Sequence, residues 1–319
     1  MSVIDEVAEN IYLIDNELYS IPRWGGIYLI NEERKVLIDS GPTTVAATVL
    51  DGIEKVGVRP QDIDYIVATH IHVDHSGGTG FLLRQMPKAK VVVHHRGARH
   101  LINPERLLRS MVAVQGEEAL AQNGEVVPVA EERIEQVYGG EVIRLGERQV
   151  LKFFDASGHS PHNIFVQESR NNGVFLGDAV GVYVPVDGGV VLPSSPPPSF
   201  NMEKCLHTID VLMKLGAAKL YFAHFGATER VQQSLQMAID QLKAWDEMIV
   251  EAMEEGGADG VLEKVRARLL LEAEPIKHIK AQYEHVVDET IPVSVRGILK
   301  YHQDKHKAEL DKRRQGEGN

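Results

Sequence analysis

The chain has 319 residues, of which 43% are hydrophobic and 25% charged, a composition that excludes a disordered chain, a collagen and a disulfide scaffold. With 46 acidic and 34 basic residues its net charge is −12, which argues against nucleic-acid binding because phosphate contacts need clustered lysine and arginine. The single cysteine and the start MSVIDEVAEN, which shows no signal peptide, predict a cytoplasmic protein. No apolar run reaches the ~20 residues of a membrane span, so no membrane association is expected.

The first half of the chain alternates short β-rich runs with helical patterns. Strands are predicted at 11–14, 27–30, 35–39, 64–68 and 90–94. Apolar residues at helical spacing predict a helix over 43–56, and a shorter helix over 81–87 ends at Pro87. Residues 97–125 are polar and poor in β-branched runs, which favours a helical insertion over one face of the core.

The second half begins with further strands and ends in helices alone. Strands are predicted at 141–145, 149–154, 164–167, 174–177 and, as the last clear one, 218–223. The proline-rich segment 193–198 predicts a stiff surface loop, and a helix follows over 202–215. The later candidate helices are 228–255, 258–272, 275–287 and 292–306, followed by a charged, frayed tail. We therefore expect an α/β domain over 1–230 and a helical domain over 231–319.

One segment, Thr-His-Ile-His-Val-Asp-His-Ser-Gly-Gly over 69–78, concentrates chemistry at the end of a predicted strand. His70 and His72 are two residues apart, so an extended backbone points both to the same side. Asp74 and His75 follow where the chain should turn, and the two glycines after Ser76 permit that turn. Imidazole and carboxylate together suit zinc, iron or manganese.

Three other apolar runs each end in a residue that can bind a metal. They deliver His159, Asp178 and His224. A single histidine after a strand is more often packed or hydrogen-bonded than a ligand. Three such strand ends together with the 69–78 segment predict one metal site built from several loops.

The order of these motifs, HxHxDH, then Gly-His, Gly-Asp and Ala-His-Phe-Gly, resembles that of the metallo-β-lactamase-fold hydrolases over residues 10–230. The resemblance implies an α/β (α+β) protein, a four-layer αβ/βα sandwich whose catalytic domain spans 1–230. The C-terminal all-helical annex is similar to that of several non-lactamase members. The implied ligands are His70, His72 and His159 for one metal, Asp74, His75 and His224 for the second, and Asp178 as the bridge.

The resemblance also implies an activity. Two divalent metal ions, zinc with iron or manganese as alternatives, share a water and lower its pKa. The bridging hydroxide then cleaves a small ester, thioester, lactone or phosphoester. Asp74 is a candidate catalytic residue that orients the nucleophile or shuttles a proton. The side chains expected to fix the imidazole tautomers are Asp39, Thr69, Ser76 and Ser160.

The cysteine that often serves as a second-site ligand in β-lactam-hydrolysing enzymes has no counterpart here. The single Cys205 shares a helix face with Ile209 and Leu212 and is interpreted as core. This pattern resembles the glyoxalase II, lactonase and phosphodiesterase branches. The alternatives are a persulfide dioxygenase with a single iron and a metal-stabilised binding protein without turnover.

The remaining candidates concern a small-molecule substrate. Trp24, His162 and Tyr183 are positioned to line its pocket. A lid from the annex would carry Lys277, His278 and Tyr283. The neighbouring pair His94 and His95 is interpreted as structural or surface-exposed. Apolar faces on the annex helices make a homodimer plausible.

Overall fold

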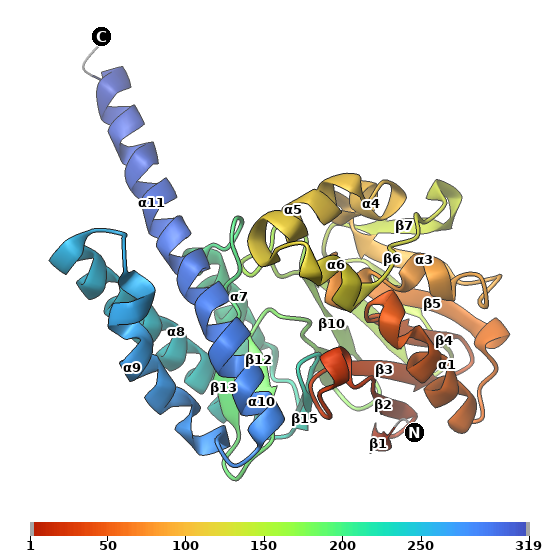
Figure 1. Ribbon diagram of the computed structural model, residues 1–319. Coiled ribbons are helices and arrows are strands. Elements are labelled where there is room, and N and C mark those ends of the chain that lie inside the picture. Colours follow the sequence, from red (N-terminus) through yellow and green to blue (C-terminus); the bar gives the residue numbers. More distant parts are fainter. Residues whose placement is uncertain (1–2, 317–319) are drawn as a thin grey trace.

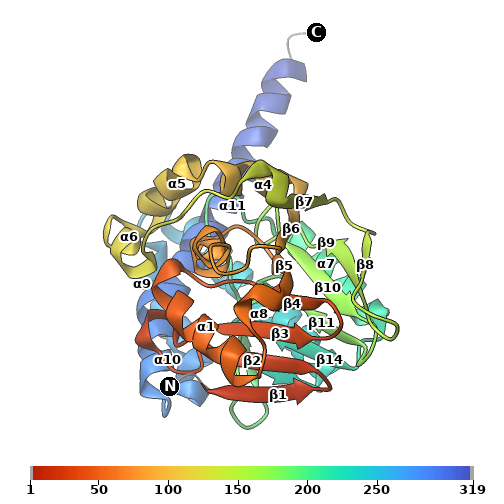
Figure 2. The ribbon, with the colours of Figure 1, turned by 90° about the vertical axis from the view of Figure 1, so that its right-hand side faces the viewer.

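The computed structural model describes residues 3–316, with side chains to residue 312. Within these residues the strands form two main sheets and a small ribbon (Figure 2). The seven-stranded sheet contains, in order, β1 (Ile4–Ala8), β2 (Ile11–Asp15), β3 (Gly26–Asn31), β4 (Lys35–Ile38), β5 (Ile63–Ala68), β6 (Lys90–His94) and β7 (Ile134–Val137). The six-stranded sheet has the order β15 (Gly226–Thr228), β14 (Lys219–Phe222), β11 (Gly173–Phe175), β10 (Ile164–Glu168), β9 (Val150–Asp155) and β8 (Val142–Arg144). The ribbon pairs β12 (Val182–Val184) with β13 (Val190–Leu192).

The helices cover the outer faces of these sheets and form the C-terminal region (Figure 1). Those of the first part are α1 (Ala46–Lys55), α2 (Val73–Ser76), α3 (Thr79–Leu82), α4 (His95–Ile102), α5 (Glu105–Gln115), α6 (Glu118–Asn123) and α7 (Met202–Leu215). Those of the last part are α8 (Val231–Gly256), α9 (Val261–Ala273), α10 (Lys280–His285) and α11 (Ile291–Gly316), with a π-helical turn η6 (Val286–Thr290) before α11. The remaining short 3-10 turns are η1 (Leu18–Ser20), η2 (Thr43–Val45), η3 (Pro60–Asp62), η4 (Glu131–Arg133) and η5 (Glu274–Ile276).

Alternating apolar residues along the strands produce four layers. In β10, Ile164 and Val166 point into the space between the two sheets, and Phe165 between them points outward. The inner cluster joins side chains of both sheets, for example Ile30 with Phe153. Separate outer clusters join the first sheet to α1 and the second to α7 and α8. The predicted αβ/βα sandwich is therefore confirmed.

The helices after residue 230, here called the annex, pack around one cluster of buried residues. Trp245 of α8, Val265 of α9 and Val295 of α11 are all buried in it. The same cluster includes Val182 and Leu192 of the ribbon, so the annex is packed against the sandwich. The C-terminal part of α11 projects away from the body (Figure 1). No helix in the described part of the chain combines the length and apolar character needed to cross a membrane.

The elements differ from the sequence predictions where local signals are weak. Five short strands, β1, β7, β12, β13 and β15, were not predicted. The prediction that 218–223 is the last strand is wrong, because β15 follows and pairs antiparallel with β14. Its sequence Gly-Ala-Thr lacks the β-branched run of a typical strand, so pairing with a neighbour determines it.

Two helical predictions also change. The helix expected over 81–87 is the shorter α3, and the one expected over 275–287 is divided among η5, α10 and η6. The expected frayed tail is helical as far as Gly316, and residues 317–319 lie outside the described part. Lys300 and Asp304 form an i,i+4 ion pair on α11 of the kind that supports an exposed helix.

Candidate metal centre

Loops that follow strands of both sheets carry the seven predicted ligand residues to one place. Four lie in the loop and short helix after β5, and one each follows β9, β11 and β14. They are His70, His72, Asp74, His75, His159, Asp178 and His224. Their side chains form three overlapping groups, in each of which the possible donor atoms lie within 4.8 Å of one another. The sequence thus predicted a cluster that the tertiary structure brings together.

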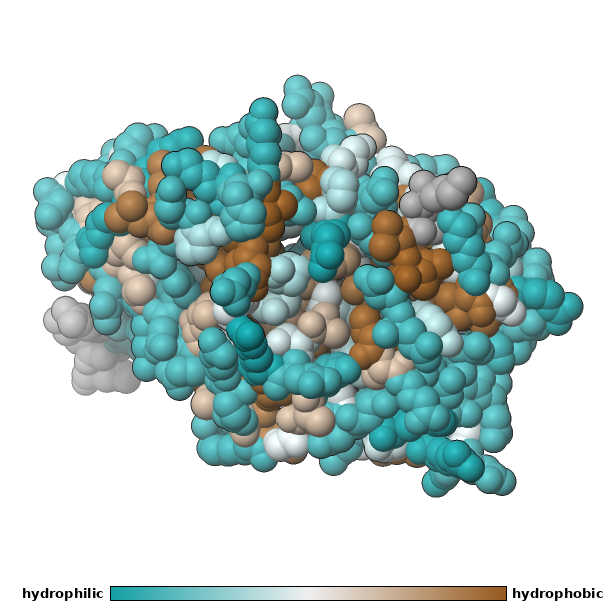
Figure 3. Space-filling view, turned by 90° about the horizontal axis from the view of Figure 1, so that it is seen from below, coloured by the Kyte–Doolittle hydropathy of each residue, from teal (hydrophilic) through white to brown (hydrophobic). Residues whose placement is uncertain are grey.

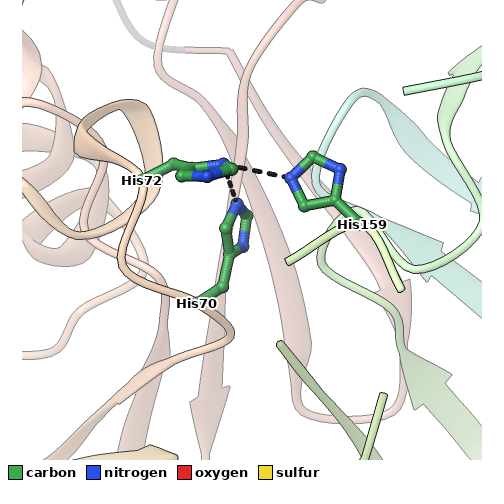
Figure 4. A group of neighbouring side chains, drawn as sticks. All are labelled: His70, His72 and His159. Carbon is green, nitrogen blue, oxygen red and sulfur yellow. Dashed lines mark hydrogen bonds between the residues drawn. The ribbon is translucent and has the colours of Figure 1, made fainter. Parts of the chain in front are cut away.

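Three imidazoles form the first group (Figure 4). His72 Nδ1 lies 3.0 Å from His70 Nε2 and 3.0 Å from His159 Nε2. The three rings come from two separate loops and point their nitrogens at a common centre (Figure 4). A proton can bridge only one nitrogen pair at a time, whereas a metal ion can accept a lone pair from all three.

The second group consists of Asp74, His75 and His224. The two Nε2 atoms are 3.1 Å apart. Asp74 Oδ2 lies 3.6 Å from His75 Nε2 and 3.5 Å from His224 Nε2. This group therefore offers two imidazoles and one carboxylate to a single centre.

The third group contains His70, His75 and Asp178, and Asp178 lies between the first two groups. Its Oδ1 is 3.3 Å from His75 Nε2, and its Oδ2 is 3.6 Å from His159 Nε2. Ser194 donates its hydroxyl hydrogen to Oδ2 at 3.2 Å. Oδ1 is buried and has no hydrogen-bond partner. Because a buried carboxylate oxygen is costly without a partner, Oδ1 is placed as expected for a metal ligand.

Hydrogen bonds on the far side of the rings fix their orientation. His75 Nδ1 lies 3.0 Å from Asp39 Oδ2, His159 Nδ1 2.9 Å from the Ser194 carbonyl oxygen, and His224 Nδ1 2.9 Å from the Trp24 carbonyl oxygen. Each oxygen accepts a hydrogen bond from the Nδ1–H group, which leaves Nε2 free to bind a metal.

The two predicted orienting residues next to these rings, Asp39 and Thr69, are linked to each other. Asp39 Oδ1 accepts the Thr69 amide at 2.7 Å and its hydroxyl at 2.9 Å. The Thr69 hydroxyl also lies 3.2 Å from His70 Nδ1. Ser76 and Ser160 do not contact the far side of a ligand ring: Ser76 donates to the His72 carbonyl, and Ser160 lies 3.0 Å from Nδ1 of His162.

The glycines at the end of the 69–78 segment have a different use from the one predicted. Gly77 and Gly78 have φ values of −62° and −80°, which any residue can adopt. A Cβ at Gly78 would lie 2.9 Å from the carbonyl oxygen of Gly41, and the Gly78 amide donates to that oxygen at 2.7 Å. Glycine is therefore needed for close packing against the loop after β4, which holds Asp39.

Burial and mutual charge shift the titration of these groups. Burial lowers the pKa of His70, and that of His72 to about 3, so both rings are neutral at pH 7. Burial opposes the charged form of Asp74, but the His75 and His224 imidazoles together outweigh it and hold the Asp74 pKa below its usual range. Burial likewise opposes the protonated form of His75, but Asp178 and other nearby carboxylates raise its pKa to about 10. The second group thus attracts a cation, and a metal ion would displace the proton on His75.

These observations test whether the residues fit metal ions. The facing ring nitrogens and the buried Asp178 oxygen without a hydrogen bond are arranged as expected for residues that surround a cation. Imidazole and carboxylate donors suit zinc, iron and manganese alike. The donor set therefore fits metal binding.

A cavity of about 1050 Å³ opens over the cluster. His72, Asp74, His159, Asp178 and His224 lie at its base. Helices α4, α5 and α6 line one side, and the α10–α11 part of the annex lines another. Figure 3, a view from below, shows several separate apolar patches on a surface that is otherwise mostly polar. The volume is that of a small-molecule site.

Two of the three predicted substrate residues line this cavity. Trp24 and His162 do so, and the His162 ring stacks on His70 with centroids 6.4 Å apart. Tyr183 does not line it and is buried, with its ring stacked on Phe222 at 4.8 Å. The Tyr183 prediction is wrong because β12 pairs with β13 and turns that side chain into the core.

The annex reaches the cavity through other residues than those predicted. Lys277 and His278 are exposed, Tyr283 packs against the annex core, and none of the three lines the cavity. The annex residues that do line it are His285, Glu289, Thr290, Val293 and Ser294. The helix expected over 275–287 is broken before α10, which changes the face that α10 and η6 present to the site.

Two aromatic residues beside the second group, Tyr19 and His285, were not predicted from the sequence. His285 makes an edge contact with Trp24 at 4.8 Å and stacks on Tyr19 at 5.5 Å. Burial raises the pKa of Tyr19 well above its usual value, and burial lowers that of His285 to about 4. Tyr19 has a φ of 56°, unusual for a non-glycine residue, and no local sequence signal indicates it.

Cys205 and the His94–His95 pair lie outside the ligand set. Cys205 is buried in the core, as predicted. His94 is buried with Nε2 3.3 Å from Asp155 Oδ2, which fits its structural interpretation. His95 stacks on Tyr138 at 4.4 Å and also lines the cavity, which was not predicted.

Comparisons with known proteins agree with this architecture. Residues 26–224 match the sequence profile of the Metallo-beta-lactamase superfamily. The chain is 28% identical over 209 residues to a metallo-beta-lactamase fold-containing protein of Sulfurisphaera tokodaii, a match that covers 64% of this chain and 74% of that protein. The crystal structure of the archaeal protein is similar with a TM-score of 0.61 at 25% identity, over 74% of this chain and 86% of that chain.

Two further similarities differ in how much of the chain they cover. A metallo-beta-lactamase family protein of Thermus thermophilus is similar in fold over 94% of this chain and 95% of its own, with a TM-score of 0.66 at 18% identity. An N-acyl homoserine lactonase from a Bacillus species is 29% identical over 102 residues, which cover 24% of this chain and 40% of the lactonase. The likeness in fold thus includes the annex, whereas the likeness in sequence to the lactonase is local.

Proposed function

Because this chain belongs to the metallo-beta-lactamase superfamily, we propose that it is a dinuclear metal-dependent hydrolase of a small ester, thioester, lactone or phosphoester. The observation that carries the proposal is the position of Asp178, whose two oxygens face two separate groups of ligand residues. A site for one metal would not need a carboxylate turned towards both.

The proposed ligands follow from the distances. His70, His72 and His159 hold one ion, and Asp74, His75 and His224 hold the other, with Asp178 shared. When bound, the metal ions would polarise the substrate oxygen and lower the pKa of a bound water. The physiological metal is proposed to be zinc, with iron or manganese as alternatives.

Asp74 is the ligand residue best placed to handle a proton. Its side chain is 26% exposed, against 6% for Asp178, and it lines the cavity. A carboxylate that reaches the cavity can accept a proton from the nucleophile and return it to the leaving group. His75 and His224 hold its Oδ2 on the metal side.

Residues beyond the ligands keep this geometry. Asp39 and Thr69 orient His75 and His70 from behind. The Ser194 carbonyl orients His159, while its hydroxyl binds Asp178. Preorganised ligands are what a hydrolytic site needs, since they do not have to reorient during the reaction.

Within the superfamily we propose the glyoxalase II and lactonase branch. The ligand cluster contains no cysteine, and burial raises the pKa of the Cys205 thiol to about 12. The local similarity to an N-acyl homoserine lactonase supports the same assignment. A persulfide dioxygenase with one iron is the competing interpretation, and the second group of ligand residues argues against it.

The test measures metal content and hydrolysis together. We expect about two ions of zinc, manganese or iron per purified chain and chelator-sensitive hydrolysis of p-nitrophenyl esters, lactones or bis-p-nitrophenyl phosphate. Asp178→Ala should lose one or both ions and the activity, whereas Asp187→Ala, on an exposed loop, should retain both. Unchanged metal content in Asp178→Ala contradicts the ligand assignment. A single iron with oxygen uptake on addition of a persulfide would instead favour the dioxygenase.

A further inference from the structure

One wall of the cavity carries three guanidinium groups. Arg96 and Arg99 are three residues apart on α4, so they share a helix face, and Arg106 lies at the start of α5. All three line the cavity. Such a cluster is unexpected in a chain with 46 acidic and 34 basic residues.

This wall begins next to the metal centre. The Arg96 guanidinium donates to the carbonyl of Pro161 at 3.4 Å, two residues after the predicted ligand His159. A Cβ at Gly97 would lie 2.8 Å from the Ile71 side chain and 3.5 Å from that of His162, so α4 is packed directly against the ligand loops. A group bound at the arginines and a bond held at the metals can therefore belong to one molecule.

The three arginines lack an acidic partner among the described residues. None of them forms an ion pair there; Arg99 Nε instead donates to His100 Nε2 at 3.2 Å. Burial, then the charges of Arg99 and Arg106, lower the pKa of His100. The acidic residues on the cavity wall outside the metal centre, Glu118 and Glu289, come from α6 and η6. Positive charge thus collects on the α4 side without compensation.

An apolar strip adjoins the arginines. Leu107, Met111 and Val114 recur at helical spacing along α5 and line the same cavity. Val293 of α11 lines it from the annex. The cavity therefore offers three kinds of surface: predicted metal ligands, guanidinium groups and an apolar wall.

We propose that this cavity selects substrates that carry an oxyanion, a carboxylate or a phosphate, which Arg96, Arg99 and Arg106 bind while the metal centre holds the bond to be cleaved. The proposal rests on the hydrolase function above and narrows its substrate class to anionic esters or thioesters with an apolar spacer. Guanidinium groups bind carboxylate and phosphate through paired N–H donors, which provides orientation as well as attraction.

The test compares three p-nitrophenyl esters whose acyl chains have similar length. They are the neutral hexanoate, the adipate hemiester with a terminal carboxylate, and the phosphonopentanoate with a terminal phosphonate. With spontaneous hydrolysis subtracted, we expect the KM of at least one anionic ester to be about tenfold or more below that of the hexanoate. The anionic ester with the lower KM identifies whether carboxylate or phosphate is the natural group.

Variants assign the effect to the arginines. In the double variant R99Q/R106Q the KM of the anionic ester should rise about tenfold, with kcat and the KM of the hexanoate unchanged. Arg109→Gln is the matched control, because Arg109 is exposed on the same helix α5 but does not line the cavity. Equal KM values for all three esters in the wild type would overturn the proposal. So would an equal rise in the KM of the anionic ester in R99Q/R106Q and in Arg109→Gln.

A binding measurement separates this proposal from the hydrolase assignment. Calorimetry on the full-length, metal-containing protein should show tighter binding of hexanesulfonate than of hexanol, and R99Q/R106Q should abolish the difference while Arg109→Gln retains it. That result without turnover of any ester would support the anion site and contradict the proposed activity. Hydrolysis of the neutral ester without any preference for anions would support the proposed activity and contradict the anion site.

Discussion

The metal centre and the cavity walls above it are built by different means. The centre consists of residues that follow strands, five of the seven buried, and Asp39, Thr69 and Ser194 contact the far sides of their rings. The walls consist of helices α4–α6 and the annex, and their lining residues range from exposed ones such as Arg96 and Glu289 to buried ones such as Leu107 and Ser294. The side chains of the centre are held by a network of hydrogen bonds. The shape of the walls depends on how the helices pack against one another.

This difference suggests a division of labour. A network of buried hydrogen bonds resists change, because removing one partner leaves another buried polar group unsatisfied. Exposed helix faces tolerate substitution, because water can form hydrogen bonds with the polar groups that lose a side-chain partner. We therefore expect variants of the centre to affect metal binding and variants of the walls to affect substrate selection.

The largest effect should come from Asp39→Asn, which touches the centre without removing a ligand. An amide in place of the carboxylate weakens its bond to His75 Nδ1 and its contacts with Thr69. We expect metal affinity to fall about 10- to 100-fold, measured by competition with a chelator. Asp64→Asn is the control, because Asp64 pairs with Lys88 at the surface. Equal metal affinity in the two variants would show that Asp39 does not position His75.

A smaller effect is expected from His285→Ala, which changes a wall. Its aromatic contacts with Trp24 and Tyr19 are each worth about 0.5–1.5 kcal/mol, so substrate KM should change several-fold while metal content stays constant. His278→Ala, on the exposed side of the same region, should behave as the wild type. Loss of metal in His285→Ala would mean that the two regions are not independent.

The smallest effect should come from the contact that ties α11 to α7. Lys305 donates to Glu203 at 2.8 Å, and hydrogen bonds from Lys305 and Tyr301 lower the Glu203 pKa to about 2. Because the folded pKa lies below the unfolded one, the pair stabilises the protein above pH 4.5 and loses its contribution as pH falls towards 2. The Glu203 side chain is 59% exposed, so Glu203→Gln should cost about 0.5 kcal/mol at neutral pH.

Urea unfolding at about pH 6 and about pH 3.5 measures this difference. The difference in the free energy of unfolding between wild type and Glu203→Gln should be smaller at the lower pH. Glu309→Gln, exposed on the same helix, should have the free energy of unfolding of the wild type at both pH values. A larger difference in the free energy of unfolding at the lower pH would contradict the prediction that Glu203 stabilises the folded protein in its ionised form.

The sequence predicted the centre better than the walls for a physical reason. His70, His72, Asp74 and His75 lie within six residues after a strongly apolar strand, so local backbone geometry already brings them together. His159, Asp178 and His224 were predicted because each also ends an apolar run. Tyr183 follows the same kind of run but was misplaced, because pairing of β12 with β13 determines which way it points.

By itself the sequence determined the alternation of strands and helices and placed metal-binding residue types at strand ends, since both are local properties of the chain, and its resemblance to a known family implied the sandwich and the ligand set. What only the tertiary structure decided is the cavity: its Tyr19 and His285 contacts, its arginine wall and the face that the annex turns towards it. These depend on the packing of segments far apart in the chain, such as those that carry Tyr19 and His285, and no short sequence pattern encodes a distance between them.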